Sequence, residues 1–283
     1  MLELRRGRIG ATAAAATASL GLVIALVASP IRPAAAVTPD PPRFELTQFA
    51  VGPNHPYFDA RRRVNLRWRY RGEPGVDVEI SLIRKASGNV VGRWEQSGLE
   101  PGTDYVRRWD GLSRRRGSVD DGAYTFRIRA VGRERMWPAG SFVWHGHIFP
   151  VDGPHSDRGA IGVFGAPRSG GRTHEGYDIV GDCGTRLRAA RGGVIATEGF
   201  DPELNGWYLL INARLSSKGY FYAHMRERSP FREGDRIHTG DFVGEIGQTG
   251  NAAGTPCHLH FEVRRSGVPI DPYPFISRWD RWS

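Results

Sequence analysis

Strict alternation of apolar and polar residues in three segments is the feature that most constrains the fold of this 283-residue chain. The segments are Val64–Tyr70, Val76–Leu82 and Tyr124–Ala130. Successive side chains of a strand point to opposite faces, so this period of two is typical of strands with one buried and one exposed face. Such half-buried strands belong to antiparallel sheets.

Turn-forming residues separate these segments. They are Gly72–Gly75, Gly88–Asn89, Pro101–Gly102 and Asp120–Gly122. Short strands at this spacing predict a β-sandwich over residues 44–133. The stretch Trp109–Gly111 followed by Val119–Ala130 resembles the closing strands of the immunoglobulin-like domain of flagellar hook-capping proteins. No cluster of catalytic residue types lies here, so spacing and binding both stay open as its role.

The composition of the sequence changes after Phe149: glycine becomes frequent, and no segment keeps a helical period. Short apolar runs recur at Val194–Ala196, Trp207–Ile211, Tyr220–Tyr222, Phe242–Val243 and His260–Val263. This pattern predicts a second all-β domain over residues 148–277, between an interdomain joint (134–147) and a short tail (278–283). The predicted fold class is therefore all-β throughout.

The N-terminal residues 1–36 have the pattern of a secretory signal peptide. Arginines at positions 5, 6 and 8 precede the apolar run Leu20–Val27, and Ala34–Ala36 offers a small-residue cleavage site. The alternative is an uncleaved membrane anchor, although the apolar run is short for a spanning helix. Residues 37–43 are predicted to be a proline-stiffened linker. We therefore expect a secreted protein with no membrane span after signal removal.

The chain is basic, with a formal net charge of +9. A basic exported protein can be attracted to an anionic cell wall, which export favours over a nucleic acid as partner. The arginines are spread along the sequence, with short runs only at Arg61–Arg63 and Arg114–Arg116. An arginine-rich soluble surface is therefore the simpler interpretation of this charge.

Two cysteines, Cys183 and Cys257, suggest a disulfide in an exported chain. The alternative is that Cys257 binds a metal together with its neighbour His258. Residues next to each other on a strand point to opposite faces, so Cys257 is expected to face away from the histidine. The disulfide is therefore preferred, with a loop-closure contribution on the order of 4 kcal/mol in the chain-entropy model.

Three short blocks carry the candidate chemistry: Thr173–Asp178, Tyr222–His224 and His258–Glu262. Glycines around His174 and Asp178 argue against a helix and favour a loop that runs into a strand. With His260 from a neighbouring strand, these residues offer two nitrogen ligands and one oxygen ligand, which suits zinc. Three protein ligands leave a fourth position open, as in a catalytic zinc site.

His258 and His224 are the candidate proton-transfer residues. His258 lies two positions from His260 and so shares its face of the strand. Zinc lowers the pKa of a bound water; one imidazole can accept the proton and the other can donate to the oxyanion. Glu175 and Glu262 are expected to face away from the ligands. The histidines assigned structural or surface roles are His55, His145, His147, His155 and His238.

Taken together, the blocks resemble the lysostaphin/LytM-type zinc endopeptidases. The matching segments are Phe164–Ile179, Tyr222–Met225, Gly247–Glu262 and the tail Ile270–Pro274. The resemblance extends over about residues 148–277 and implies a small antiparallel sheet domain with a groove. It places the zinc ligands at His174, Asp178 and His260 and the catalytic histidines at His224 and His258. A cysteine at position 257 departs from the family pattern.

The resemblance implies a secreted enzyme that cleaves peptide bonds of peptidoglycan stems or cross-bridges. One alternative is a non-catalytic relative that binds the wall or activates another hydrolase. Such proteins typically lack some ligands or catalytic histidines, whereas all five residues are present here. A wall-anchoring role for the sandwich domain is a third hypothesis and is compatible with catalysis.

Overall fold

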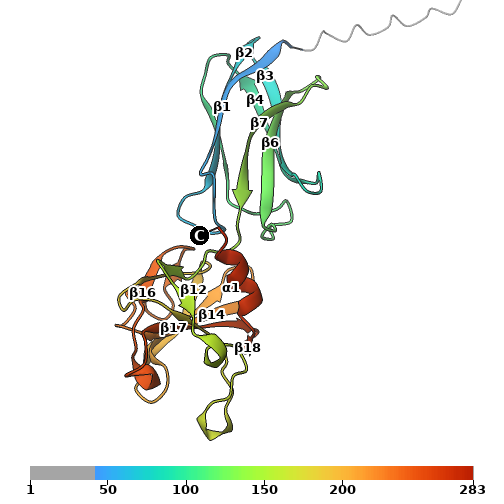
Figure 1. Ribbon diagram of the computed structural model, residues 1–283. Helices are drawn as coiled ribbons and strands as arrows, with labels where there is room; N and C mark the ends of the chain where they lie inside the picture. Colours follow the sequence, from blue (N-terminus) through green and yellow to red (C-terminus); the bar gives the residue numbers. More distant parts are fainter. Residues whose placement is uncertain (1–41, 283) are drawn as a thin grey trace, which may run out of the picture. The chain divides into compact units, whose positions relative to one another are not determined.

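The computed structural model describes residues 42–282 (Figure 1). The predicted signal peptide and residues 37–41 of the predicted linker lie outside the described residues. Among the residues that are described, no helix has the length and apolar character needed to span a membrane.

Residues 44–144 form two antiparallel sheets. The first contains β1 (Phe44–Gly52), β2 (Val64–Gly72) and β5 (Tyr105–Trp109), in that order. The second has the order β4 (Val90–Leu99), β3 (Val76–Arg84), β6 (Gly122–Ala130) and β7 (Trp137–Trp144). The three alternating segments of the sequence are thus strands β2, β3 and β6, as predicted.

The alternation explains how the two sheets share one core. In β2, Val64, Leu66 and Trp68 are buried, whereas Arg67 between them is exposed. Side chains from both sheets join a single apolar cluster, in which Trp109 of β5 contacts Tyr124 of β6 with ring centroids 5.9 Å apart. The arrangement is a β-sandwich, in agreement with the predicted fold class.

The remaining residues are built around an eight-stranded antiparallel sheet. Its order is β15 (Arg236–Ile237), β12 (Gly193–Asp201), β13 (Gly206–Ala213), β14 (Lys218–Met225), β17 (His258–Arg265), β10 (Tyr177–Val180) and β9 (Ser156–Asp157), with β18 (Val268–Ile270) also paired to β17. A small sheet contains β16 (Phe242–Glu245), β11 (Arg186–Arg188) and β8 (Val151–Asp152). The only α-helix among the described residues is α1 (Tyr273–Trp279).

Strand β17 lies inside this sheet, between β14 and β10, and its two faces meet different surroundings. Leu259, Phe261 and Val263 are fully buried in the second apolar cluster. The residues that alternate with them, including His258 and His260, point to the opposite face, as the period of two requires. Antiparallel pairing places Asp178 of β10 opposite His260, and Ala223 of β14 opposite His260 on the other side. The register therefore brings the three sequence blocks to one place.

Candidate metal centre

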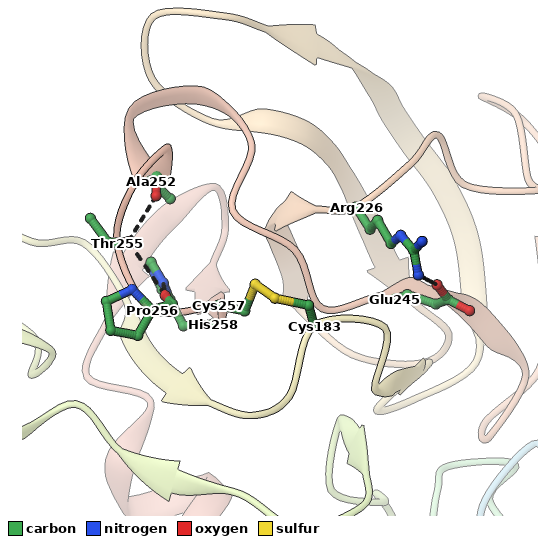
Figure 2. The surroundings of a disulfide bond; sticks show 8 residues. All are labelled: Cys183, Arg226, Glu245, Ala252, Thr255, Pro256, Cys257 and His258. Atoms are coloured by element: carbon green, nitrogen blue, oxygen red, sulfur yellow. Dashed lines mark hydrogen bonds and ion pairs between the residues drawn. A yellow bond between two sulfur atoms is a disulfide. The ribbon is translucent and has the colours of Figure 1, made fainter.

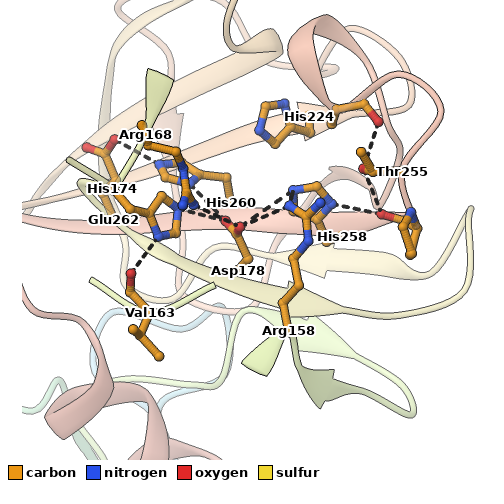
Figure 3. Close-up of polar contacts among 12 residues, drawn as sticks. Arg158, Val163, Arg168, His174, Asp178, His224, Thr255, His258, His260 and Glu262 are labelled. Carbon is orange, nitrogen blue, oxygen red and sulfur yellow. Dashed lines mark hydrogen bonds and ion pairs between the residues drawn. The ribbon is translucent and has the colours of Figure 1, made fainter. Parts of the chain in front are cut away.

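His174, Asp178 and His260 converge so that one atom of each faces a shared point (Figure 3). Nε2 of His174 lies 2.9 Å from Oδ1 of Asp178, and Nδ1 of His260 lies 3.0 Å from the same oxygen. The two ring nitrogens are 2.8 Å apart. All three side chains are buried. This trio matches the set of ligands predicted from the sequence.

The local chain path explains how residues four apart in sequence reach one point. His174 lies in a loop just before β10, and Asp178 lies within that strand. Gly176 passes directly over the site: a Cβ there would lie 2.6 Å from the carbonyl oxygen of Phe261 and 2.7 Å from Cε1 of His260. A larger residue would push β17 and the His260 ring away. The predicted loop running into a strand is confirmed.

The second nitrogen of each of these histidines is held by an acceptor. Nδ1 of His174 donates to the carbonyl oxygen of Val163 at 2.8 Å. Nε2 of His260 donates to Oε1 of Glu262 at 3.1 Å. These bonds fix the ring orientations in which Nε2 of His174 and Nδ1 of His260 face the shared point, as in many metal sites.

The expectation that Glu262 faces away from the ligands was wrong. Glu262 is two residues from His260 on β17, so the same alternation that pairs His258 with His260 also places Glu262 on their face. The carboxylate is buried and accepts a second bond from Nε of Arg264 at 2.6 Å. Glu175, by contrast, is exposed.

Charges at this point are strongly coupled. Burial alone would raise the pKa of Asp178, but hydrogen bonds from His174 and His260 hold it below its usual range. Burial alone would lower the pKa of His260, whereas hydrogen bonds to Asp178 and Glu262 raise it to about 9. The cluster therefore stabilises positive charge at Nδ1 of His260, where a proton and a metal ion compete.

His224 stands beside the trio in a conformation that is unusual for a non-glycine residue. Its φ is 60°, in the left-handed region, although it lies within β14. Its backbone N–H donates to Asn205 at 2.8 Å, and its Nδ1 donates to the carbonyl oxygen of Thr249 at 2.9 Å. Nε2 is therefore the nitrogen left to accept a proton. Burial, together with His260 and His258, lowers the pKa of His224 to about 3.

His258 is buried on the same side of the site, with its ring centroid 5.0 Å from that of His224. Its Nδ1 donates to the carbonyl oxygen of Pro256 at 2.9 Å. Its Nε2 lies 3.0 Å from Nη1 of Arg158 and must accept, because a guanidinium only donates. Burial lowers the pKa of His258, consistent with a neutral ring.

Two arginines that the sequence did not single out complete the surroundings. Nη1 of Arg158 donates to Oδ2 of Asp178 at 3.1 Å, and Nη2 of Arg168 lies 3.5 Å from the same oxygen. Arg158 follows the two-residue strand β9, which reaches the site only by pairing with β10. Arg158 lies outside the segments that resemble the family, and Arg168 lies within Phe164–Ile179 without a role assigned to it, so only the fold identifies both as neighbours of the site.

A groove of about 450 Å³ opens over the site. Its walls include the trio, both further histidines and both arginines. The lining also includes neutral residues, among them Leu204, Asn205 and Asn251. An extended ligand can thus reach the shared point from solvent.

The predicted disulfide is confirmed. Cys183 and Cys257 are bonded, with their Cα atoms 5.3 Å apart, and no free cysteine is present among the described residues (Figure 2). Cys257 immediately precedes His258, and Cys183 follows β10, which carries Asp178. The bond therefore joins the two segments that supply the trio.

Comparison with known proteins assigns this part of the chain to a class. Residues 172–272 match the sequence model of Peptidase family M23. The chain thus carries a peptidase M23 domain of the lysostaphin/LytM type, in agreement with the resemblance noted from its motifs.

Individual relatives share this region. A lipoprotein NlpD/LppB homolog of Pseudomonas aeruginosa is 34% identical over 117 residues, which cover 41% of this chain and 37% of the relative. An L-Ala–D-Glu endopeptidase of Bacillus subtilis is 26% identical over 148 residues, or 48% of this chain and 44% of the relative. The chain therefore spans less than half the length of these relatives. Among solved structures, LytU aligns with 30% identity over 41% of this chain and 82% of LytU, at a TM-score of 0.37.

Proposed function

We propose that this protein is an exported zinc endopeptidase that cleaves peptide bonds in peptidoglycan stems or cross-bridges. The observation that carries the proposal is the trio His174, Asp178 and His260, with two further histidines beside it in one groove. The relative named as an L-Ala–D-Glu endopeptidase supports the reaction, and a Vibrio cholerae relative named as a peptidoglycan DD-endopeptidase, 32% identical over 103 residues, supports the substrate class. Export is supported by the disulfide, since such bonds persist in oxidising compartments.

The donor set fits zinc. Two imidazole nitrogens and one carboxylate oxygen are ligands that zinc accepts, and they leave one position open. The three ligand atoms lie 2.8 to 3.0 Å from one another, close enough for a single ion to be held by all of them. When bound, zinc would polarise a substrate carbonyl and make a water acidic enough to attack it.

The surrounding residues are assigned to proton transfer and to stabilisation of the oxyanion. His224, a neutral imidazole with Nδ1–H held by Thr249, accepts a proton at Nε2 and can return it to the departing amine. Nε2 of His258 already accepts a hydrogen bond from Arg158, so His258 is not the residue that we assign to take the proton from water. We assign His258 and the positive charge of Arg158 to the side of the groove where the oxyanion forms.

Two measurements on residues 37–283 distinguish this enzyme from a non-catalytic protein. Bound zinc is measured after metal-free dialysis and reconstitution, and release of new amines is followed with purified peptidoglycan of several chemotypes. We expect one zinc per chain and amine release that a chelator abolishes and added zinc restores. Stoichiometric zinc without amine release on any chemotype would instead support a wall-binding or hydrolase-activating protein.

Glu262 is expected to tune zinc affinity through His260. In Glu262→Gln, the shape remains but the negative charge behind the ligand is lost, so the imidazole becomes a weaker ligand. We expect zinc affinity about 10-fold lower, measured by competition with a chelating dye at fixed pH. Glu175→Gln is the matched control, because this exposed carboxylate adjoins His174 in sequence. Equal affinities for the two variants would exclude the role of Glu262.

The disulfide is expected to brace the site. In Cys183→Ser/Cys257→Ser, the segment after β10 and the start of β17 lose their covalent link. We expect weaker zinc binding and a melting temperature lowered by several degrees, since removal of a native disulfide costs about 2–5 kcal/mol. Loss of thermal stability with unchanged zinc affinity and activity would show that the bond stabilises the fold and does not brace the site.

A further inference from the structure

A second hollow, of about 680 Å³, lies in the β-sandwich and is lined by arginines. The arginines at positions 62, 63, 67 and 108 are exposed around it. A fifth, Arg61, is already paired with Asp241 at 2.7 Å. No acidic residue lines the hollow. Its other walls are neutral, so the hollow concentrates positive charge.

The strand register explains why a hollow forms here. On the outer face of the first sheet, Arg67 of β2 is opposite Ala50 of β1. One pleat further along, Asn65 lies between Gly52 of β1 and Arg108 of β5. The small residues of β1 fill little space, which leaves a depression beside the long arginine side chains. Pro53 continues this low edge.

Other arginines on the same face are paired with acidic residues. Further along β2, Arg69 is bonded to Asp104 at 2.9 Å and Arg71 to Glu45 at 2.6 Å. Around the hollow, by contrast, Arg62, Arg63 and Arg108 make no ion pair among the described residues. The sheet therefore neutralises its arginines at one end and leaves them available at the other.

The lining indicates the chemistry of the ligand. Guanidinium groups bind phosphate through paired hydrogen bonds and remain charged at any physiological pH. Four of them around one hollow match a ligand with several anionic groups. No aromatic ring lines the hollow, so it lacks the stacking platform typical of single-stranded nucleic acid sites. Asn65 also lines the hollow, and its side-chain amide can form a hydrogen bond with a ligand hydroxyl.

We propose that this hollow binds a phosphodiester-linked polyol polymer of the cell envelope. The site is separate from the metal centre and does not depend on the proposed peptidase activity. Bound to such a polymer, the sandwich domain would hold the protein at the wall by charge. Repeating phosphates would contact several arginines at once, so binding is expected to weaken steeply with salt.

The test uses residues 37–283 and purified poly(glycerol phosphate) as the probe, with affinity measured over a range of NaCl concentrations. In the variant Arg62→Gln/Arg67→Gln/Arg108→Gln, we expect at least about 10-fold weaker binding and a shallower salt dependence. The matched control Arg114→Gln/Arg115→Gln/Arg116→Gln removes the same charge from the loop between β5 and β6, and we expect less than about 2-fold change there. Unchanged melting temperatures establish that both variants are folded.

Three results would overturn the proposal. Equal losses in the two triple variants would mean that net charge alone attracts the polymer. Equally tight, hollow-dependent binding of poly-γ-glutamate would show that the site takes polyanions without preference for phosphodiesters. Hollow-dependent binding of phosphatidylglycerol vesicles, without binding of the soluble polymer, would identify a membrane surface as the occupant. None of these measurements depends on peptidoglycan hydrolysis, so their outcome is independent of the proposed peptidase activity.

Discussion

Replacing His260 with alanine is expected to abolish both zinc binding and peptidoglycan cleavage. His260 is the central member of the trio: its Nδ1 lies within 3.0 Å of both Oδ1 of Asp178 and Nε2 of His174. Its loss leaves two ligands, and the buried carboxylates of Asp178 and Glu262 lose a shared partner. We expect no stoichiometric zinc after dialysis and amine release at the level of the buffer control.

The His260→Ala result needs a variant that separates metal loss from misfolding. Asp178→Asn keeps the side-chain shape and removes the ligand charge, so it should lose zinc with less disturbance of the sheet. His55→Ala is the control, because His55 is exposed and lies outside the groove. Full zinc occupancy in folded Asp178→Asn and His260→Ala would refute the assignment of this trio as the metal site.

Replacing His224 with alanine is expected to remove activity while zinc stays bound. Its Nε2 is the proton acceptor in the proposed mechanism, and a positioned general base contributes about 10²–10⁴-fold to rate. The trio does not include His224, so we expect one zinc per chain and amine release reduced by about that factor.

The backbone at this residue suggests the control. Since His224 has a φ of 60°, asparagine tolerates the position better than alanine does. His224→Asn should therefore keep the fold and metal and be as inactive as His224→Ala. Near-wild-type activity in either zinc-loaded variant would exclude His224 as the base and direct attention to His258.

Most of what could be predicted about the fold and the site came from the period-two alternation of strand residues. The alternation in β2, β3 and β6 predicted the sandwich, and the spacing of His258 and His260 correctly placed both on one face. The same rule covers Glu262, and the error there came from treating it as a sequence neighbour of the ligand when it is two residues away. Helix α1 was not expected, because it is only seven residues long.

Features made by cross-strand register lay beyond the sequence. Arg158 reaches His258 from 100 residues away because β9 pairs with β10, and no local pattern records that pairing. The hollow of arginines arises in the same way, from small residues on β1 placed opposite long ones on β2. Spread along the sequence, these arginines gave the impression of diffuse charge.

The bond between Cys183 and Cys257 has a consequence for resistance to proteolysis. The cysteines are 74 residues apart, and His224 lies on the chain between them. A single proteolytic cut anywhere in that interval leaves two fragments that are still joined through sulfur. His174 and Asp178 precede the first cysteine, and His258 and His260 follow the second, so such a nick cannot release one half of the metal centre from the other.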